Sequence, residues 1–131
     1  MNTGTLRPLA IGVFVVSSFF MSNLSYAACR TIGKPIFNIV KGFGMDVYRV
    51  SDGGNCGIGY TSNGGTSFTS AKIAKKPSSG TLTQDSRFHF RYRPNNGFLG
   101  EDNFIINVCA DYGGKPAGCV NNNYTIKVEV K

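Results

Sequence analysis

The chain has 131 residues, with 14 lysines and arginines against 7 aspartates and glutamates, and its formal net charge is +7. This length suits one domain with a hydrophobic core rather than two. The single histidine and four cysteines without Cys-x-x-Cys spacing exclude the usual zinc sites, and the aspartates are too dispersed for a calcium site, so we expect no metal and no cofactor.

Residues 1–27 have the plan of a secretory signal peptide. Arg7 precedes an apolar run over residues 9–20, and small and polar residues follow up to Ala27. The run is shorter than the ~20 residues that a membrane-spanning helix needs. We predict cleavage after Ala27, a mature domain of residues 28–131 and a secreted or periplasmic location. Cleavage removes only Arg7 from the charged residues, which leaves a formal charge near +6.

Beyond the signal peptide the sequence predicts short strands and no helix. Stretches with β-type patterning alternate with Gly, Pro, Asn and Ser turns. Seven such strands predict an antiparallel immunoglobulin-like β-sandwich. They are residues 36–41, 45–50, 67–75, 80–83, 87–93, 103–109 and 120–130.

Four cysteines in a small exported domain predict two disulfides. If the seven strands run alternately up and down, the segments that carry the cysteines all emerge at one end of the sandwich. We favour the pairs Cys29 with Cys56 and Cys109 with Cys119. The pairs Cys56 with Cys109 and Cys29 with Cys119 are also geometrically open.

The loops at this end have two interpretations. The disulfides would simply hold a glycine-rich loop over residues 51–66. Alternatively, the stapled loops would present Tyr60, Tyr112 and the asparagines at 121–123 as a preorganised recognition surface.

The segment 87–93 alternates strictly between polar and aromatic residues, the period of a half-buried strand. Its aromatic residues face the core, and the other face carries a row of basic groups suited to sulfate, phosphate or carboxylate groups on a polymer. The alternative is a solvated outer face whose arginine stems cover apolar neighbours. Because the aromatic residues point inward, no base stacking and no nucleic-acid partner are expected. The row consists of Arg87, His89, Arg91 and Arg93.

A tight corner follows this strand. Pro94 has no backbone amide to donate to a neighbouring strand, and residues 95–97 are of types that favour turns. Phe98 can fill the inside of the corner, and Gly100 permits a second bend. Asp102 is placed to accept hydrogen bonds from loop amides before an alternating strand resumes.

The corner pattern Phe-x-Tyr-x-Pro-(x)3-Phe-x-Gly-x-Asp-x-Phe resembles the bacterial immunoglobulin-like and cadherin-like repeats of surface and adhesion proteins. The resemblance covers the C-terminal half of the chain, including a Pro-x-x-Gly-Thr turn at residues 77–81. It implies a β-sandwich and an adhesion-type binding role. The residues that carry the corner pattern are Phe90, Tyr92, Pro94, Phe98, Gly100, Asp102 and Phe104.

The sequence offers no catalytic constellation. Adjacent residues of a strand point to opposite faces, which counts against a carboxylate pair at Glu101 and Asp102, so we expect no enzyme. We favour an exported monomeric binding module that recognises a glycan, an anionic surface or a protein. The alternative is a structural or assembly subunit that pairs with another chain through a sheet edge.

Overall fold

The computed structural model describes Gly4, Gly12 and residues 28–130, and the predicted signal peptide lies outside the described residues apart from those two glycines. The described part contains strands and turns and no helix. The eight strands are β1 (Cys29–Ile32), β2 (Asp46–Ser51), β3 (Cys56–Gly59), β4 (Thr66–Lys75), β5 (Gly80–Ser86), β6 (His89–Pro94), β7 (Gly100–Tyr112) and β8 (Lys115–Val128).

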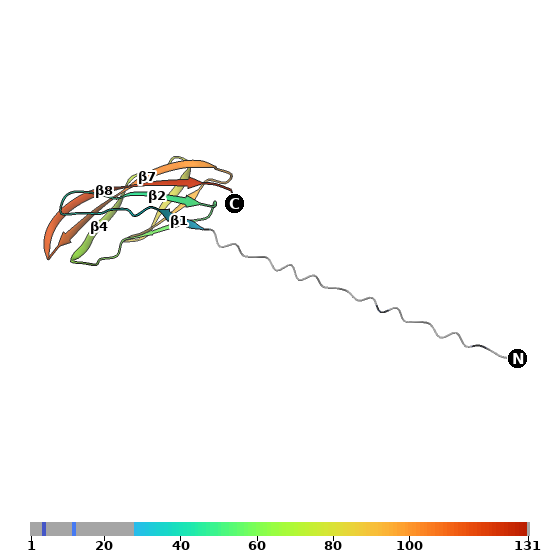
Figure 1. Cartoon of the computed structure of the whole chain (residues 1–131), viewed down its shortest axis with the longest axis horizontal. Helices are drawn as coiled ribbons and strands as arrows, with labels where there is room; N and C mark the ends of the chain where they lie inside the picture. The colour runs from blue at the N-terminus through green and yellow to red at the C-terminus, as the bar shows by residue number, and fades with distance from the viewer. Residues whose placement is uncertain (1–3, 5–11, 13–27, 131) are drawn as a thin grey trace.

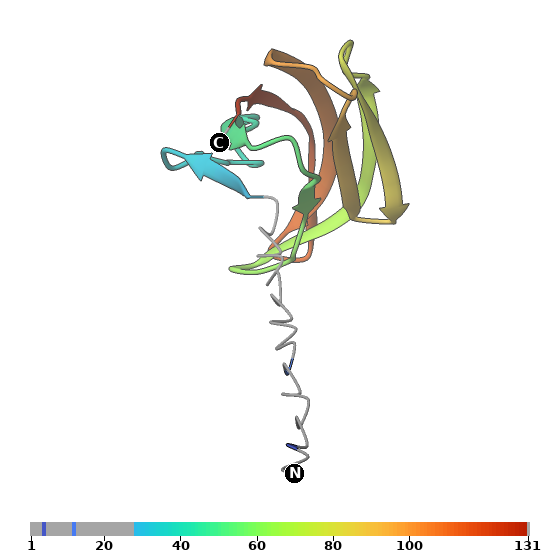
Figure 2. The same ribbon diagram turned by 90° about the vertical axis from the view of Figure 1, so that its right-hand side faces the viewer.

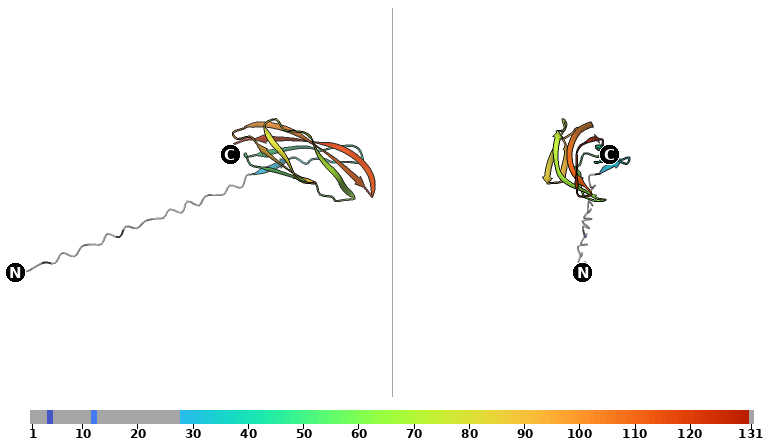
Figure 3. Two further views of the ribbon diagram at one scale, coloured as in Figure 1. Left: turned by 180° about the vertical axis from the view of Figure 1, so that it is seen from behind. Right: turned by 90° about the vertical axis from the view of Figure 1, so that its left-hand side faces the viewer.

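The strands form two sheets. One sheet has the order β1-β2-β8-β7-β4 and the other has the order β3-β6-β5. The pairs within them are antiparallel except that β2 runs parallel to β8. The long strands β7 and β8 run along the molecule in Figure 1. Figure 2 and the right-hand view of Figure 3 show β5 and β6 as a separate layer beside them.

The core lies between the two sheets, and β6, β7 and β8 each point alternate residues into it. Phe104 and Ile106 of β7 are fully buried, as is Tyr92 of β6. The rings of Tyr92, Phe104 and Tyr124 stack in series, with centroids 5.5 and 5.1 Å apart. This stack joins β6 of the small sheet to β7 and β8 of the large one, so the two sheets share one continuous core.

The predicted strands need correction at three places, the first of which is β1, Cys29–Ile32, where no strand was predicted. Residues 36–41 form no strand, because the chain turns back on itself with mutual backbone hydrogen bonds between Asn38 and Phe43 and with Gly42 at φ 72°. Conversely, residues 56–59, predicted as loop, form β3, which pairs with β6. The two glycines of β3 hide the strand pattern, but Cys56 and Ile58 point inward and are buried.

Because β3 is an additional strand, the strands before it run in the opposite direction along the sandwich from the one that we expected. We name the two ends of the sandwich after the structural feature at each. The corner end is where β2 and β8 finish and β7 begins, at Ser51, Val128 and Gly100. The hairpin end is where β7 finishes and β8 begins, at Tyr112 and Lys115.

Both favoured disulfides are present, but they do not share an end. Cys29 bonds to Cys56, and Cys29 also lies opposite Ser51 at the corner end. Cys109 bonds to Cys119 across the β7–β8 ladder near the hairpin end. Through Ser51 and Val128, Cys29 lies level with Gly100, so about nine residues of β7, roughly 30 Å, separate it from Cys109. The prediction of four clustered cysteines was wrong because it lacked β3. Two disulfides indicate an oxidising compartment, extracellular or periplasmic.

Candidate functional site

Three of the four basic residues predicted on one strand face lie together, whereas Arg87 lies in the turn between β5 and β6 and donates to the Thr69 carbonyl of the other sheet, so its predicted place on the strand was wrong. His89, Arg91 and Arg93 are the exposed members of β6, the central strand of the small sheet, and Arg87 precedes it. We call these four residues the basic face. Lys72, Lys75 and Lys76 belong to the other sheet or directly follow it, as expected.

The neighbouring strands leave the basic face accessible. On one side β3 places Gly57 opposite Arg91 and Gly59 opposite His89, so no side chain stands beside them. On the other side β5 places Thr83 opposite Arg91 and Thr81 opposite Arg93. These threonines and the two arginines line an open hollow of about 300 Å³. Guanidinium groups and hydroxyl donors are suited to an anionic group.

Each basic side chain is also held by a neighbour. Arg91 forms an ion pair of 2.7 Å with Asp85, and Arg93 Nε donates to Asn55 Oδ1 at 3.0 Å. Arg87 donates to the Thr69 carbonyl at 2.6 Å and lies over the ring of Phe88. These contacts fix the orientation of the arginines, and only Asp85 contributes an opposing charge to them.

The predicted tyrosine surface does not form. Tyr60 is 6% exposed, and its hydroxyl lies 2.8 Å from that of Tyr124 and accepts a hydrogen bond from Asn122 Nδ2 at 3.0 Å. Asn122 belongs to β8 rather than to a loop and is fully buried. Burial raises the pKa of Tyr60 and of Tyr124 above the usual value. Tyr60 is therefore a core residue that closes a polar cluster.

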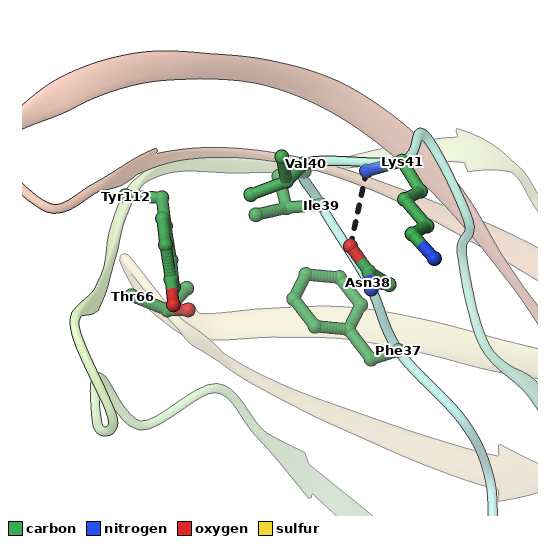
Figure 4. A pocket seen from close by; sticks show the side chains of 7 residues that line it. All are labelled: Phe37, Asn38, Ile39, Val40, Lys41, Thr66 and Tyr112. Carbon is green, nitrogen blue, oxygen red and sulfur yellow. Dashed lines mark hydrogen bonds between the residues drawn. The ribbon is translucent and has the colours of Figure 1, made fainter.

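Tyr112, in contrast, is exposed at the hairpin end. With Thr66 it forms one side of a hollow of about 310 Å³, and residues 37–41 form the other side (Figure 4). Sequence reasoning missed these partners because it treated residues 36–41 as a strand. The signal that could have revealed the turn is Asn38, whose side chain accepts from the Lys41 amide at 3.0 Å.

The predicted corner is built as expected. Asp102 is 1% exposed and accepts hydrogen bonds from the amides of Ser78, Ser79 and Asn103 and from the Tyr92 hydroxyl. Burial, followed by the Asp102 carboxylate, raises the pKa of Tyr92. Pro94 ends β6 and Gly100 begins β7 with φ 123°. Phe98 packs against the core between them.

The hydrogen bonds of the corner are made by buried groups. Asp102 has no exposed surface to offer, and its neighbour Glu101 points to the opposite, exposed side of β7. Within the described residues, no group of three or more His, Cys, Asp or Glu is placed to hold a metal ion.

No match to this chain was found among protein families, characterised proteins or solved structures. In the part of the chain that the structure describes, no helix is long and apolar enough to span a membrane.

Proposed function

We propose that the chain is an exported, non-catalytic binding module that recognises an anionic glycan through its basic face. The observation that carries this proposal is the hollow between Arg91, Arg93 and the threonines of β5 on an otherwise open sheet face. Alternate residues of β6 lie about 7 Å apart, a spacing suited to repeated carboxylate or sulfate groups. The positive charge of the chain would also attract such a polymer.

We further propose an immunoglobulin-like sandwich as the scaffold. In immunoglobulin constant domains, strands B, E and D share one sheet and C, F and G share the other. Here β3, β6 and β5 have the first order, and β4, β7 and β8 have the second. This correspondence supports the resemblance of the corner sequence to the bacterial immunoglobulin-like and cadherin-like repeats.

The edge strands favour binding over assembly. At one edge of the large sheet, β4 has register shifts after Phe68 and after Ile73, and it carries two lysines. At the other edge, β1 is only four residues long. Bulges, charges and short length are the features by which natural sheets discourage pairing with another chain.

The test compares two variants that each lose three positive charges. We expect Arg87→Ser/Arg91→Ser/Arg93→Ser to bind immobilised heparin and polygalacturonate roughly tenfold more weakly than the wild type at moderate salt. The matched control is Lys72→Ser/Lys75→Ser/Lys76→Ser on the other sheet, which should retain most of the affinity. Equal weakening by both variants would show unspecific charge attraction and reject the basic face as a site.

A further inference from the structure

The segment between β1 and β2 exposes apolar side chains that the core does not use. We call residues 33–45 the apolar loop. Ile36 is 79% exposed, Val40 is 60% exposed and Phe43 is 61% exposed. Tyr112, 50% exposed, lies next to the loop across the hollow in Figure 4. Several exposed apolar side chains on one short loop indicate an interaction surface.

This exposure is imposed by a well-anchored turn. Ile39 is 3% exposed and holds the middle of the loop in the core. Asn38 and Phe43 exchange two backbone hydrogen bonds on either side of it. The turn therefore buries one apolar residue and directs its neighbour Val40 to solvent.

The return of the loop to the sheet is equally fixed. Gly44 lies so close to β8 that a Cβ there would overlap the carbonyl of Asn121. The Met45 amide donates to Asn122 Oδ1 at 2.7 Å. The exposed apolar residues thus belong to a preorganised surface, which lowers the cost of binding.

The charge of this region indicates the partner. Residues 33–45 contain Lys34 and Lys41 and no acidic residue, and Lys115 lies at the tip of the adjacent hairpin, whose strand β7 also carries Asp111. Asp46, the first acid after the loop, accepts a hydrogen bond from Asn123. Exposed aliphatic and aromatic side chains combined with lysines are suited to a lipid bilayer, in which an apolar interior lies beneath a layer of anionic headgroups.

We propose that the apolar loop docks on an anionic phospholipid bilayer. Val40, Phe43 and Ile36 enter the boundary between headgroups and acyl chains, and Lys34 and Lys41 contact the headgroup phosphates. Tyr112 lies at the same level, where aromatic side chains with a polar end are favoured. This surface does not include the basic face, so the two proposals stand or fall separately.

The experiment measures co-sedimentation of the exported, oxidised protein with vesicles. One set contains phosphatidylcholine with roughly one third phosphatidylglycerol, and the other contains phosphatidylcholine alone. We expect binding to the anionic vesicles only, at a strength set by buried apolar area and by charge. Val40→Ser/Phe43→Ser should require at least about tenfold more lipid for half-maximal binding. Lys34→Ser/Lys41→Ser should also weaken binding.

Two controls match these variants. Leu99 and Val130 are 58% and 74% exposed and line a hollow at the corner end, so Leu99→Ser/Val130→Ser removes equally exposed apolar groups elsewhere. It should bind like the wild type. The basic-face triple variant should likewise retain vesicle binding. Circular dichroism and intact disulfides confirm that each variant is folded.

Several results would overturn the proposal. They are the absence of wild-type binding to anionic vesicles, unchanged binding by Val40→Ser/Phe43→Ser, and equal weakening by either control. Sedimentation velocity without lipid tests the other possible occupant, a second copy of the chain. A wild-type dimer that Val40→Ser/Phe43→Ser converts to a monomer would assign the apolar loop to self-association instead.

Discussion

The corner end of the sandwich buries a carboxylate, whereas the hairpin end exposes apolar side chains and a tyrosine. At the corner end a carboxylate, Asp102, is removed from water and satisfied by backbone amides and a tyrosine hydroxyl. At the hairpin end, Tyr112 and the neighbouring residues Val40 and Phe43 of the apolar loop are left in water. The corner end therefore depends on a buried polar group, although Leu99 and Val130 are exposed there, whereas the hairpin end carries the exposed apolar loop.

The largest effect is expected from breaking the corner. Asp102→Ala leaves buried amides and the Tyr92 hydroxyl without an acceptor, so we expect a loss of about 3–5 kcal/mol in the free energy of unfolding. Urea denaturation measures this loss. Asp102→Asn, which keeps one acceptor oxygen, should lose less.

The neighbouring residue supplies the control. Glu101 is exposed, and its carboxylate accepts one hydrogen bond from the Tyr48 hydroxyl at 3.1 Å. Glu101→Ala should cost no more than about 1 kcal/mol. Similar losses for the two alanine variants would show that the corner does not depend on the buried carboxylate.

The two disulfides allow the ends to be weakened separately. Cys29 and Cys56 are 27 residues apart, and Cys109 and Cys119 are 10 apart. Restriction of the unfolded chain predicts a loss of about 3.5 kcal/mol for Cys29→Ser/Cys56→Ser and about 2.7 kcal/mol for Cys109→Ser/Cys119→Ser. Thermal and urea unfolding of the two variants would measure this order, and the reverse order would contradict the loop-length argument.

Alkaline pH tests the buried tyrosines at both ends. The pKa values of Tyr60, Tyr92 and Tyr124 are raised in the folded chain, chiefly by burial. Their contribution to stability is complete below the unfolded value near pH 10 and is lost as the pH rises beyond it. At pH 10.5 we expect a loss of up to about 0.8 kcal/mol for each tyrosine that stays protonated in the folded chain, and thus at most about 2.5 kcal/mol for the three.

Urea unfolding at several pH values, combined with tyrosinate absorbance, measures this decline. Up to about pH 9, these tyrosines should leave the free energy of unfolding unchanged. Complete tyrosine ionisation at pH 11 with an unchanged fold would contradict the burial of the three hydroxyl groups.

The C-terminal half was the more predictable part of the fold. Strict alternation placed Phe90 and Tyr92 in the core and Arg91 on the surface, because a strand has only two faces. Turn-forming residue types predicted the corner, where Asp102 does accept hydrogen bonds from loop amides. The favoured disulfide pairs were also right.

The N-terminal half was predicted less well for a physical reason. The segment 36–41 has strand-like composition, but backbone hydrogen bonding around Gly42 turns it. The burial of Tyr60 depends on hydrogen bonds to residues more than sixty positions away. Neither effect is visible in local patterning. The basic face was recognised, whereas the apolar loop required tertiary information.

The pairing of β1 with β2 brings residues 28 and 130 to the same end of the domain, where Ala28 contacts Asp52 and Glu129 contacts Ser51. Tension applied between these residues passes from Cys29 directly to Cys56 through the disulfide. The bridge bypasses residues 30–55, which include the apolar loop. Pulling on residues 28 and 130 would therefore not extend that loop while the disulfide is intact.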